Sequence, residues 1–255
     1  MLLELSGVTK HFGGVSAVKD IGFSVTEGSI VALIGPNGAG KTTLFNIITG
    51  TLAPDKGSIT IKGRDIVGFK PFQIASAGIT RTFQNLQLFS SMTVLENVMA
   101  GAYLRSKKGF IKSFFSFPRN CREEKKIREE SLILLEEIGL FETAGLSASA
   151  LPFGKQRLLE IARALASDPA LVLLDEPAAG LNPAETEVLT GYLKKLRNKG
   201  TAMILIEHDM GTVMEAADRI VVLNFGQMIA EGTPAEIQAN SEVIKAYLGE
   251  DEKIA

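Results

Sequence analysis

The chain has 255 residues, of which 45% are hydrophobic and 22% charged, and its formal net charge is −2. These values are ordinary for a globular protein of one or two domains, and they give no support for a nucleic-acid-binding surface, which is usually strongly basic. The only cysteine is Cys121, so an intramolecular disulfide and a cysteine-based metal cluster are both excluded.

The N-terminal part has the alternating pattern of antiparallel strands. Residues 3–8 and 21–25 place apolar side chains at every second or third position, and Gly13-Gly14 and Glu27-Gly28 predict turns. Residues 58–63 predict a further short strand. We therefore expect an antiparallel β subdomain at this end of the chain.

A buried strand predicted over 30–34 leads into a glycine-rich loop and then a helical stretch over 44–49. The loop matches G-x-x-x-x-G-K-[ST], in which backbone N–H groups and the helix dipole converge on a phosphate. Lys41 is expected to reach the β- and γ-phosphates, and the Thr42 hydroxyl to ligate Mg²⁺. An ordinary glycine-rich turn is disfavoured by the strand–loop–helix context. The predicted loop residues are Gly35, Pro36, Asn37, Gly38, Ala39, Gly40, Lys41, Thr42 and Thr43.

The middle of the chain changes to a helical pattern from about residue 86 to about residue 167. Apolar side chains recur at helical spacing within 127–138 and again within 158–166. The predicted organisation is a core of about 1–85 and 168–255 that surrounds a helical subdomain of about 86–167.

Short apolar strands then alternate with helices. The predicted strands are 171–174, 202–206 and 220–223, the predicted helices are 183–199 and 210–217, and residues 224–226 predict a terminal hairpin. Strands that alternate with helices favour a parallel sheet, and such sheets bind phosphates at the carboxyl ends of their strands. The predicted fold class is α/β, with a parallel-sheet core, an N-terminal antiparallel β subdomain and a helical insertion.

Polar side chains follow two of these strands. Asp175 and Glu176 come directly after the run 171–174. At the tip of a strand beside the phosphate loop, Asp175 is expected to hold Mg²⁺ and Glu176 to activate an attacking water. His208 follows the strand 202–206 and suits a hydrogen bond to a γ-phosphate or a water, although a role in capping the next helix is the alternative.

The order of these motifs resembles the ATP-binding cassette of ABC transporters over almost the whole chain. The resemblance implies that Phe12 stacks on adenine, that Gln84 senses the γ-phosphate and Mg²⁺, that Glu176 is the general base and that His208 is the switch histidine. It also implies a signature that acts on the ATP of the opposite subunit. The signature residues are Leu151, Pro152, Phe153, Gly154, Lys155 and Gln156.

The signature departs from the family's usual Leu-Ser-Gly-Gly-Gln. Pro152 replaces a serine whose hydroxyl normally reaches the γ-phosphate of the opposite subunit, Phe153 replaces a glycine, and Lys155 is also unusual. Proline suits the first turn of a helix, and the N–H groups of Gly154 and Lys155 remain available for a phosphate. Asn182 stands where the family usually has an aspartate. We expect binding across the dimer to be retained.

A narrower resemblance is to the ATPase subunits of branched-chain amino acid importers. It is carried by 78–84, 207–210 and 246–250, and the extra segment Tyr103–Cys121 looks like the longer of that system's two ATPases. This segment is basic and aromatic, and it is expected to pack locally on the helical insertion or, alternatively, to lie against the membrane or a membrane subunit.

The resulting hypothesis is an ATP-hydrolysing subunit of a membrane importer that uses ATP and Mg²⁺. Its expected partners are a second ABC ATPase subunit, identical or related, integral membrane permease subunits and, indirectly, a periplasmic binding protein, with no nucleic acid. Because the sequence has no signal peptide and no spanning run of about 18 apolar residues, we expect it at the cytoplasmic face of the membrane. The alternatives are the ATPase of a lipopolysaccharide exporter and a soluble cassette that works on ribosomes or DNA.

Overall fold

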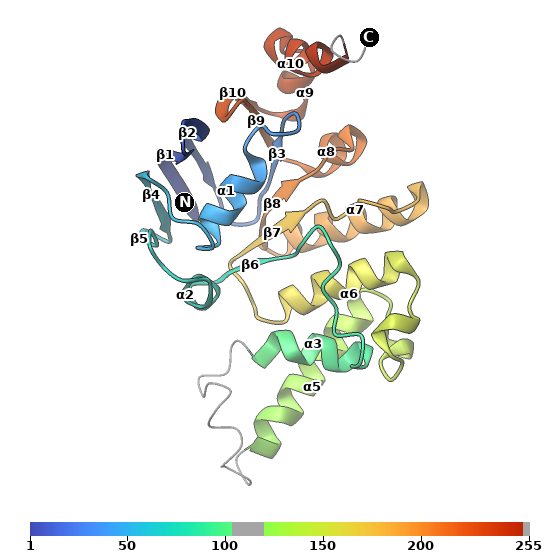
Figure 1. The fold of residues 1–255 in the computed structure, drawn as a ribbon. Helices are drawn as coiled ribbons and strands as arrows, with labels where there is room; N and C mark the ends of the chain where they lie inside the picture. The colour runs from blue at the N-terminus through green and yellow to red at the C-terminus, as the bar shows by residue number, and fades with distance from the viewer. Residues whose placement is uncertain (104–119, 252–255) are drawn as a thin grey trace.

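The computed structural model describes residues 1–103 and 120–251 and shows an α/β fold with two sheets (Figure 1). The strands are β1 (Leu3–Phe12), β2 (Val15–Val25), β3 (Ile30–Ile34), β4 (Lys56–Ile61), β5 (Arg64–Asp65), β6 (Ile79–Arg81), β7 (Leu171–Asp175), β8 (Ala202–Ile206), β9 (Arg219–Asn224) and β10 (Gln227–Gly232). The described helices are α1 (Lys41–Ile48), α2 (Pro71–Ser76), α3 (Val94–Ala102), α5 (Asn120–Glu137), α6 (Phe153–Leu165), α7 (Pro183–Asn198), α8 (Met210–Ala216), α9 (Pro234–Gln238) and α10 (Ser241–Asp251).

The first sheet is antiparallel and has the strand order β2-β1-β4-β5. Leu3 and Leu5 on β1 and Ile21 on β2 point into a core that α1 shares through Leu44 and Phe45. The predicted N-terminal β subdomain is therefore confirmed. The predicted strand over 58–63 is wrong at its end, because Lys62 and Gly63 adopt positive φ angles of 50° and 75° and turn the chain from β4 into β5.

The second sheet has the order β10-β9-β3-β8-β7-β6, in which β10 is antiparallel to β9 and the other neighbours are parallel. Every residue of β3, β7 and β8 is buried. Burial on both faces explains why these strands read as unbroken apolar runs. The carboxyl ends of the three strands meet at one edge of the sheet, and the loops that follow them form the site described below.

A second core covers the other face of this sheet. Val172, Leu174 and Met203 pack there with residues of α3, α5, α6 and α7 (Figure 1). The predicted helical stripes supply part of this core, including Ile127 and Ile161. The division into a core of about 1–85 and 168–255 and a helical subdomain of about 86–167 stays a prediction.

Within residues 1–103 and 120–251, no helix has both the length and the apolar character that crossing a bilayer requires. The segment Tyr103–Cys121, for which local packing was expected, lies outside the described residues except at its ends.

Candidate nucleotide site

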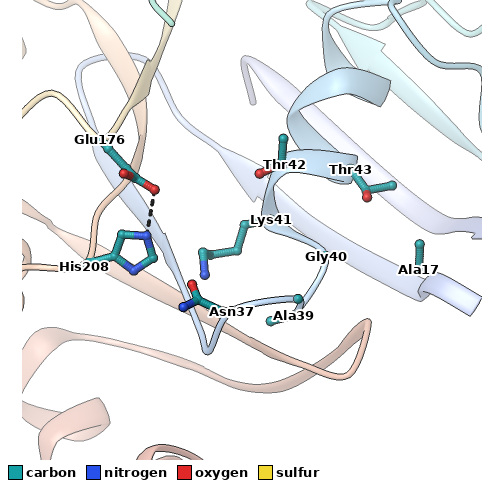
Figure 2. Close-up of a pocket in the computed structure, with 10 residues that line it drawn as sticks. Ala17, Asn37, Ala39, Gly40, Lys41, Thr42, Thr43, Glu176 and His208 are labelled. Carbon is teal, nitrogen blue, oxygen red and sulfur yellow. Dashed lines mark hydrogen bonds and ion pairs between the residues drawn. The ribbon is translucent and has the colours of Figure 1, made fainter. Parts of the chain in front are cut away.

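The predicted phosphate loop connects the end of β3 to the start of α1 and lines a pocket of about 190 Å³ (Figure 2). The pocket is completed by Ala17, Glu176 and His208. Gly40 stands at the N-cap of α1 with a φ of 102°, and a Cβ there would lie 2.4 Å from the carbonyl oxygen of Ala17. Only glycine fits this conformation and this close approach. No side chain caps α1, so its first turn offers N–H groups to a ligand.

Lys41 is the first residue of α1, three positions before the predicted start at Leu44, and only 7% of it is exposed. Its Nζ donates hydrogen bonds to the carbonyl oxygens of Gly35 and Pro36, at 2.5 and 2.9 Å. Figure 2 shows the side chain extending back along the loop towards Asn37. The cation is thus already held inside the loop, where the predicted β- and γ-phosphate contacts require it.

Glu176 brings the three predicted catalytic side chains together. Its Oε1 lies 2.6 Å from His208 Nε2 (Figure 2). Its Oε2 accepts a hydrogen bond of 2.8 Å from Gln84 Nε2. The backbone N–H of Glu176 also donates to the carbonyl oxygen of Ile206 at the end of β8. Each oxygen of the carboxylate therefore has its own side-chain partner, from a segment distant in the sequence.

Asp175 ends β7 but does not line the pocket. Its Oδ2 lies 2.6 Å from Arg81 Nη2, in an ion pair whose side chains are 8% and 9% exposed. Arg81 also donates to Asn46 Oδ1 at 2.7 Å, and its guanidinium lies 5.4 Å from the centre of the Phe45 ring and 5.3 Å from that of Phe83. Arg81 therefore fixes Asp175 relative to α1, the helix that carries the phosphate loop.

The oxygen groups of Thr42, Gln84 and Asp175 are of the kind that Mg²⁺ prefers. Among the described residues there is no group of three or more histidine, cysteine or acidic side chains placed to hold a metal. Of the three predicted ligands, Thr42 lines the phosphate-loop pocket, while Asp175 is paired with Arg81 and Gln84 with Glu176.

Glu207 is a buried carboxylate that connects two loops of the site. It accepts hydrogen bonds from the backbone N–H of Ala178, at 2.6 Å, and of His208, at 3.1 Å. Burial raises the pKa of the Glu207 carboxyl, because the charged form loses its hydration. The cap of α8 is Asp209, which accepts from the N–H of Thr212 at 2.8 Å, so capping is not the role of His208.

Comparisons with known proteins agree with this geometry. A family model described as ABC transporter matches residues 18–179, and one described as Branched-chain amino acid ATP-binding cassette transporter matches residues 227–253. The chain is 46% identical to the branched-chain amino acid transport ATP-binding protein BraF of Pseudomonas aeruginosa and 44% identical to LivG of Escherichia coli K12, over 98% of each chain.

The chain belongs to the ATP-binding cassettes of ABC transporters. Such cassettes bind and hydrolyse ATP, so the predicted α/β cassette fold and ATPase class are confirmed. A crystal structure of the ADP conformation of an ABC transporter cassette matches with a TM-score of 0.85 and 32% identity, covering 97% of this chain and 98% of that one. A dimeric cassette in a post-hydrolysis state, bound to ADP and Pi, matches with a TM-score of 0.75 and 27% identity, covering 91% of this chain and 99% of that one.

The predicted signature lies at the start of α6 and contributes nothing to the lining of this chain's own phosphate-loop pocket. Pro152 is the N-cap of α6, one position before the first turn, and no side chain caps the helix. Phe153 is 45% exposed and lies against Gly180. This position suits the prediction that Gly154 and its neighbours act on another subunit's nucleotide.

Asn182, where the family usually has an aspartate, caps α7. Its side chain accepts a hydrogen bond of 3.0 Å from the N–H of Glu185, and Glu185 Oε2 accepts one of 3.0 Å from the N–H of Asn182. This reciprocal pair is a capping box. Phe12, at the end of β1, is 52% exposed and does not line the pocket, so its contact with adenine stays a prediction.

Several residues that organise this cassette were not predicted from its sequence. Arg81, whose side chain is 9% exposed, and the buried Glu207 lie beside predicted site residues. A buried pair on α6, Arg157 and Glu160, contacts the segment of Gln84. A signal was present for Glu207, because it follows directly on the apolar run 202–206, whereas Arg81 stands between two threonines in a stretch that is not apolar. A charge in such a position needs a buried partner.

Proposed function

We propose that the chain is the ATP-hydrolysing subunit of a membrane importer for branched-chain amino acids. The observation that carries hydrolysis is the Glu176 carboxylate, which is held by Gln84 and His208 at the edge of the phosphate-loop pocket. Support for the substrate comes from relatives named for branched-chain amino acid transport and from the C-terminal family match over 227–253.

In this proposal the loop N–H groups and Lys41 bind the triphosphate, and Phe12 stacks on the adenine. Thr42, Gln84 and Asp175 are the residues that would hold Mg²⁺, which supplies charge neutralisation at the phosphates when it is bound. Glu176 accepts a proton from the attacking water as its general base. Gln84 and His208 orient the carboxylate by holding one oxygen each, and His208 also lines the phosphate-loop pocket, where a γ-phosphate would meet it.

The active unit is proposed to be a pair of cassettes, with the signature of each closing on the ATP of the other. The absence of a side-chain cap at α6 supports this, because its first-turn N–H groups suit an anion from outside the chain. The likeness to a dimeric cassette bound to ADP and Pi is further support. Whether the partner is a second copy or a related chain decides how many signatures of this kind the transporter contains.

A groove of about 1700 Å³ is the proposed docking place of the permease subunits. It lies between α2 and β6 on one side and α3 and α6 on the other, next to the segment of Gln84. Phe83, Phe89 and Met92 line it with exposed apolar surface, which marks protein-interaction sites. We propose that residues 86–167 move as a helical subdomain with the permease, at the cytoplasmic face of the membrane, and that a periplasmic binding protein delivers the amino acid.

The test of hydrolysis is Glu176→Gln. We expect near-normal ATP affinity, because the phosphate loop is unchanged, and ATP turnover reduced by about two orders of magnitude or more, because the amide cannot take the proton. Phosphate release and a fluorescent-nucleotide titration measure the two quantities. Unchanged turnover would remove Glu176 from its role.

The assignment to a transport system is tested by identifying the proteins that co-purify with this chain. Affinity purification from native membranes should bring integral permease subunits and a second ATPase, and deletion of the gene should abolish high-affinity uptake of labelled leucine. Recovery of lipopolysaccharide export subunits, or of ribosomes, together with normal leucine uptake, would contradict the importer.

A further inference from the structure

Helix α6 carries a buried ion pair whose arginine directly follows the signature. The Arg157 and Glu160 side chains are 4% and 1% exposed, and Nη1 of the arginine lies 3.1 Å from Oε2 of the glutamate. Removing both charges from water is costly, so such a pair is weak support for stability by itself. Its remaining hydrogen bonds indicate what it does.

Both members of the pair hold the irregular segment that contains Gln84. Arg157 donates from Nη2 to the carbonyl oxygen of Gln84, at 2.6 Å, and from Nη1 to that of Phe83, at 3.1 Å. Glu160 Oε1 accepts from the backbone N–H of Gln87 at 3.3 Å. The segment 83–87 lies outside any helix or strand, so these side chains satisfy backbone groups that regular structure leaves unpaired.

The same arginine reaches the signature. Its guanidinium lies 5.6 Å from the centre of the Phe153 ring, at the first position of α6. Gln84 in turn contacts Glu176 beside the phosphate loop. A continuous set of contacts therefore runs from the proposed general base, through Gln84 and Arg157, to the start of α6.

We propose that Arg157 and Glu160 are positioning residues that latch the Gln84 segment to α6, so that Gln84 and the signature move together. This rests on the proposed function. When contact with a γ-phosphate shifts Gln84 at one site, the latch moves the start of α6 together with it. The start of α6 in turn contacts the ATP of the opposite subunit. The two ATP sites of a dimer are thereby coupled through each chain, and ATP-driven association depends on the latch.

The experiment uses the full-length chain in the Glu176→Gln background, in which hydrolysis is slow. Arg157→Met with Glu160→Met removes both charges together, because removing one would leave the other buried and unpaired. We expect ATP affinity of the monomer to stay within about twofold and the dimer dissociation constant with ATP to rise about tenfold or more. Sedimentation and a fluorescent-nucleotide titration measure these values, with thermal unfolding as the check on folding.

A double-mutant cycle separates a latch from simple packing. In a Gln84→Ala background the same pair of substitutions should change the dimer dissociation constant by less than about twofold, because the latch acts through Gln84. Equal effects with and without Gln84 would overturn the proposal. Arg157→Lys keeps the charge but not the two-pronged geometry, so it should give the same Gln84-dependent loss if the double variant does not fold.

Lys194→Met is the matched control, because it removes a cation from the exposed pair with Glu215 and leaves α6 untouched. It should dimerise like the background chain. If the background chain itself does not dimerise with ATP, a dimer of two copies of this chain is wrong, and the latch between its two sites fails with it. If it dimerises and the Arg157 variants dimerise equally well, the latch alone is wrong.

Discussion

The helices α6 and α7 begin next to each other, but only α7 has a side-chain cap for the N–H groups of its first turn. A Cβ on Gly154 of α6 would lie 2.5 Å from Oε1 of Glu185 on α7, so the two starts are in close contact. α7 satisfies its own N–H groups with the capping box of Asn182 and Glu185. α6 begins at Pro152 without a side-chain cap, as α1 does at Gly40. We infer that a side-chain cap stabilises the fold, while an uncapped helix start in this cassette leaves its N–H groups available to bind a phosphate.

The largest effect is expected at α1, where the uncapped start is joined by a buried cation. Lys41→Ala should weaken ATP binding by the monomer by about a hundredfold, because a charge-assisted contact to the phosphates is lost. Isothermal titration measures the affinity, and Lys199→Ala, which breaks an exposed pair with Glu137, is the control. Normal ATP binding by Lys41→Ala would show that the cation at the uncapped start of α1 does not bind the phosphates.

Gly154→Ala tests the contact between α6 and α7. The new Cβ has to displace the Glu185 carboxylate, which should shift the start of α6 and reduce ATP turnover by about tenfold to a hundredfold. The free energy of unfolding should change little, because the higher helix propensity of alanine offsets the weakened capping box. Turnover assays test the loss of ATP hydrolysis, and urea unfolding tests the unchanged free energy of unfolding. A stable variant with full turnover would show that the position of α6 is unimportant.

Asn182→Ala should destabilise the fold without affecting monomer ATP affinity. Loss of the cap of α7 is expected to cost about 1 kcal/mol in the free energy of unfolding. Pro152→Ala at the corresponding position of α6 is the matched substitution, and it should cost less, because no capping hydrogen bond is present there. Equal losses in urea unfolding would contradict the distinction between the two helix starts.

The smallest effect concerns Glu207, which joins the loops after β7 and β8. Its pKa is raised in the folded state by burial, so its contribution to stability is fully present below the unfolded pKa and is lost as pH rises through the folded pKa. Relative to Glu207→Gln, the wild-type chain should therefore lose melting temperature as the pH rises above 4.5, the ordinary pKa of a glutamate, and through the raised pKa of the folded state. A constant difference across this range would show that Glu207 does not titrate in the folded chain.

The elements that the sequence predicted well are those with a local signal. β3 and β8 were predicted at their observed bounds, because a strand buried on both faces is a continuous apolar run. The end of the strand predicted over 58–63 was wrong. Lys62 and Gly63 form a turn with positive φ angles, although the strand pattern of the preceding residues continues through them in sequence. The capping box of Asn182 was readable as Asn-x-x-Glu but was interpreted only as a departure from a family contact.

The site was predictable as a set of residues but not as a set of contacts. Glu176, Gln84 and His208 were singled out, whereas their convergence on one carboxylate depends on the order of strands in the sheet. The pairs that hold the site, Arg81 with Asp175 and Arg157 with the Gln84 segment, join residues separated by 94 and 73 positions. Nothing local in the sequence specifies such partners, since they arise only when the elements pack.

The strand that leads into the phosphate loop lies between two strands made much later. β3 pairs with β8 and β9, which belong to the last quarter of the chain. Until the ribosome has delivered residues 202–224, β3 has no parallel neighbour in its sheet, and the backbone in front of the phosphate loop is not held. A truncated or half-translated chain therefore lacks a supported phosphate loop, so that only finished copies should be able to use the cell's ATP.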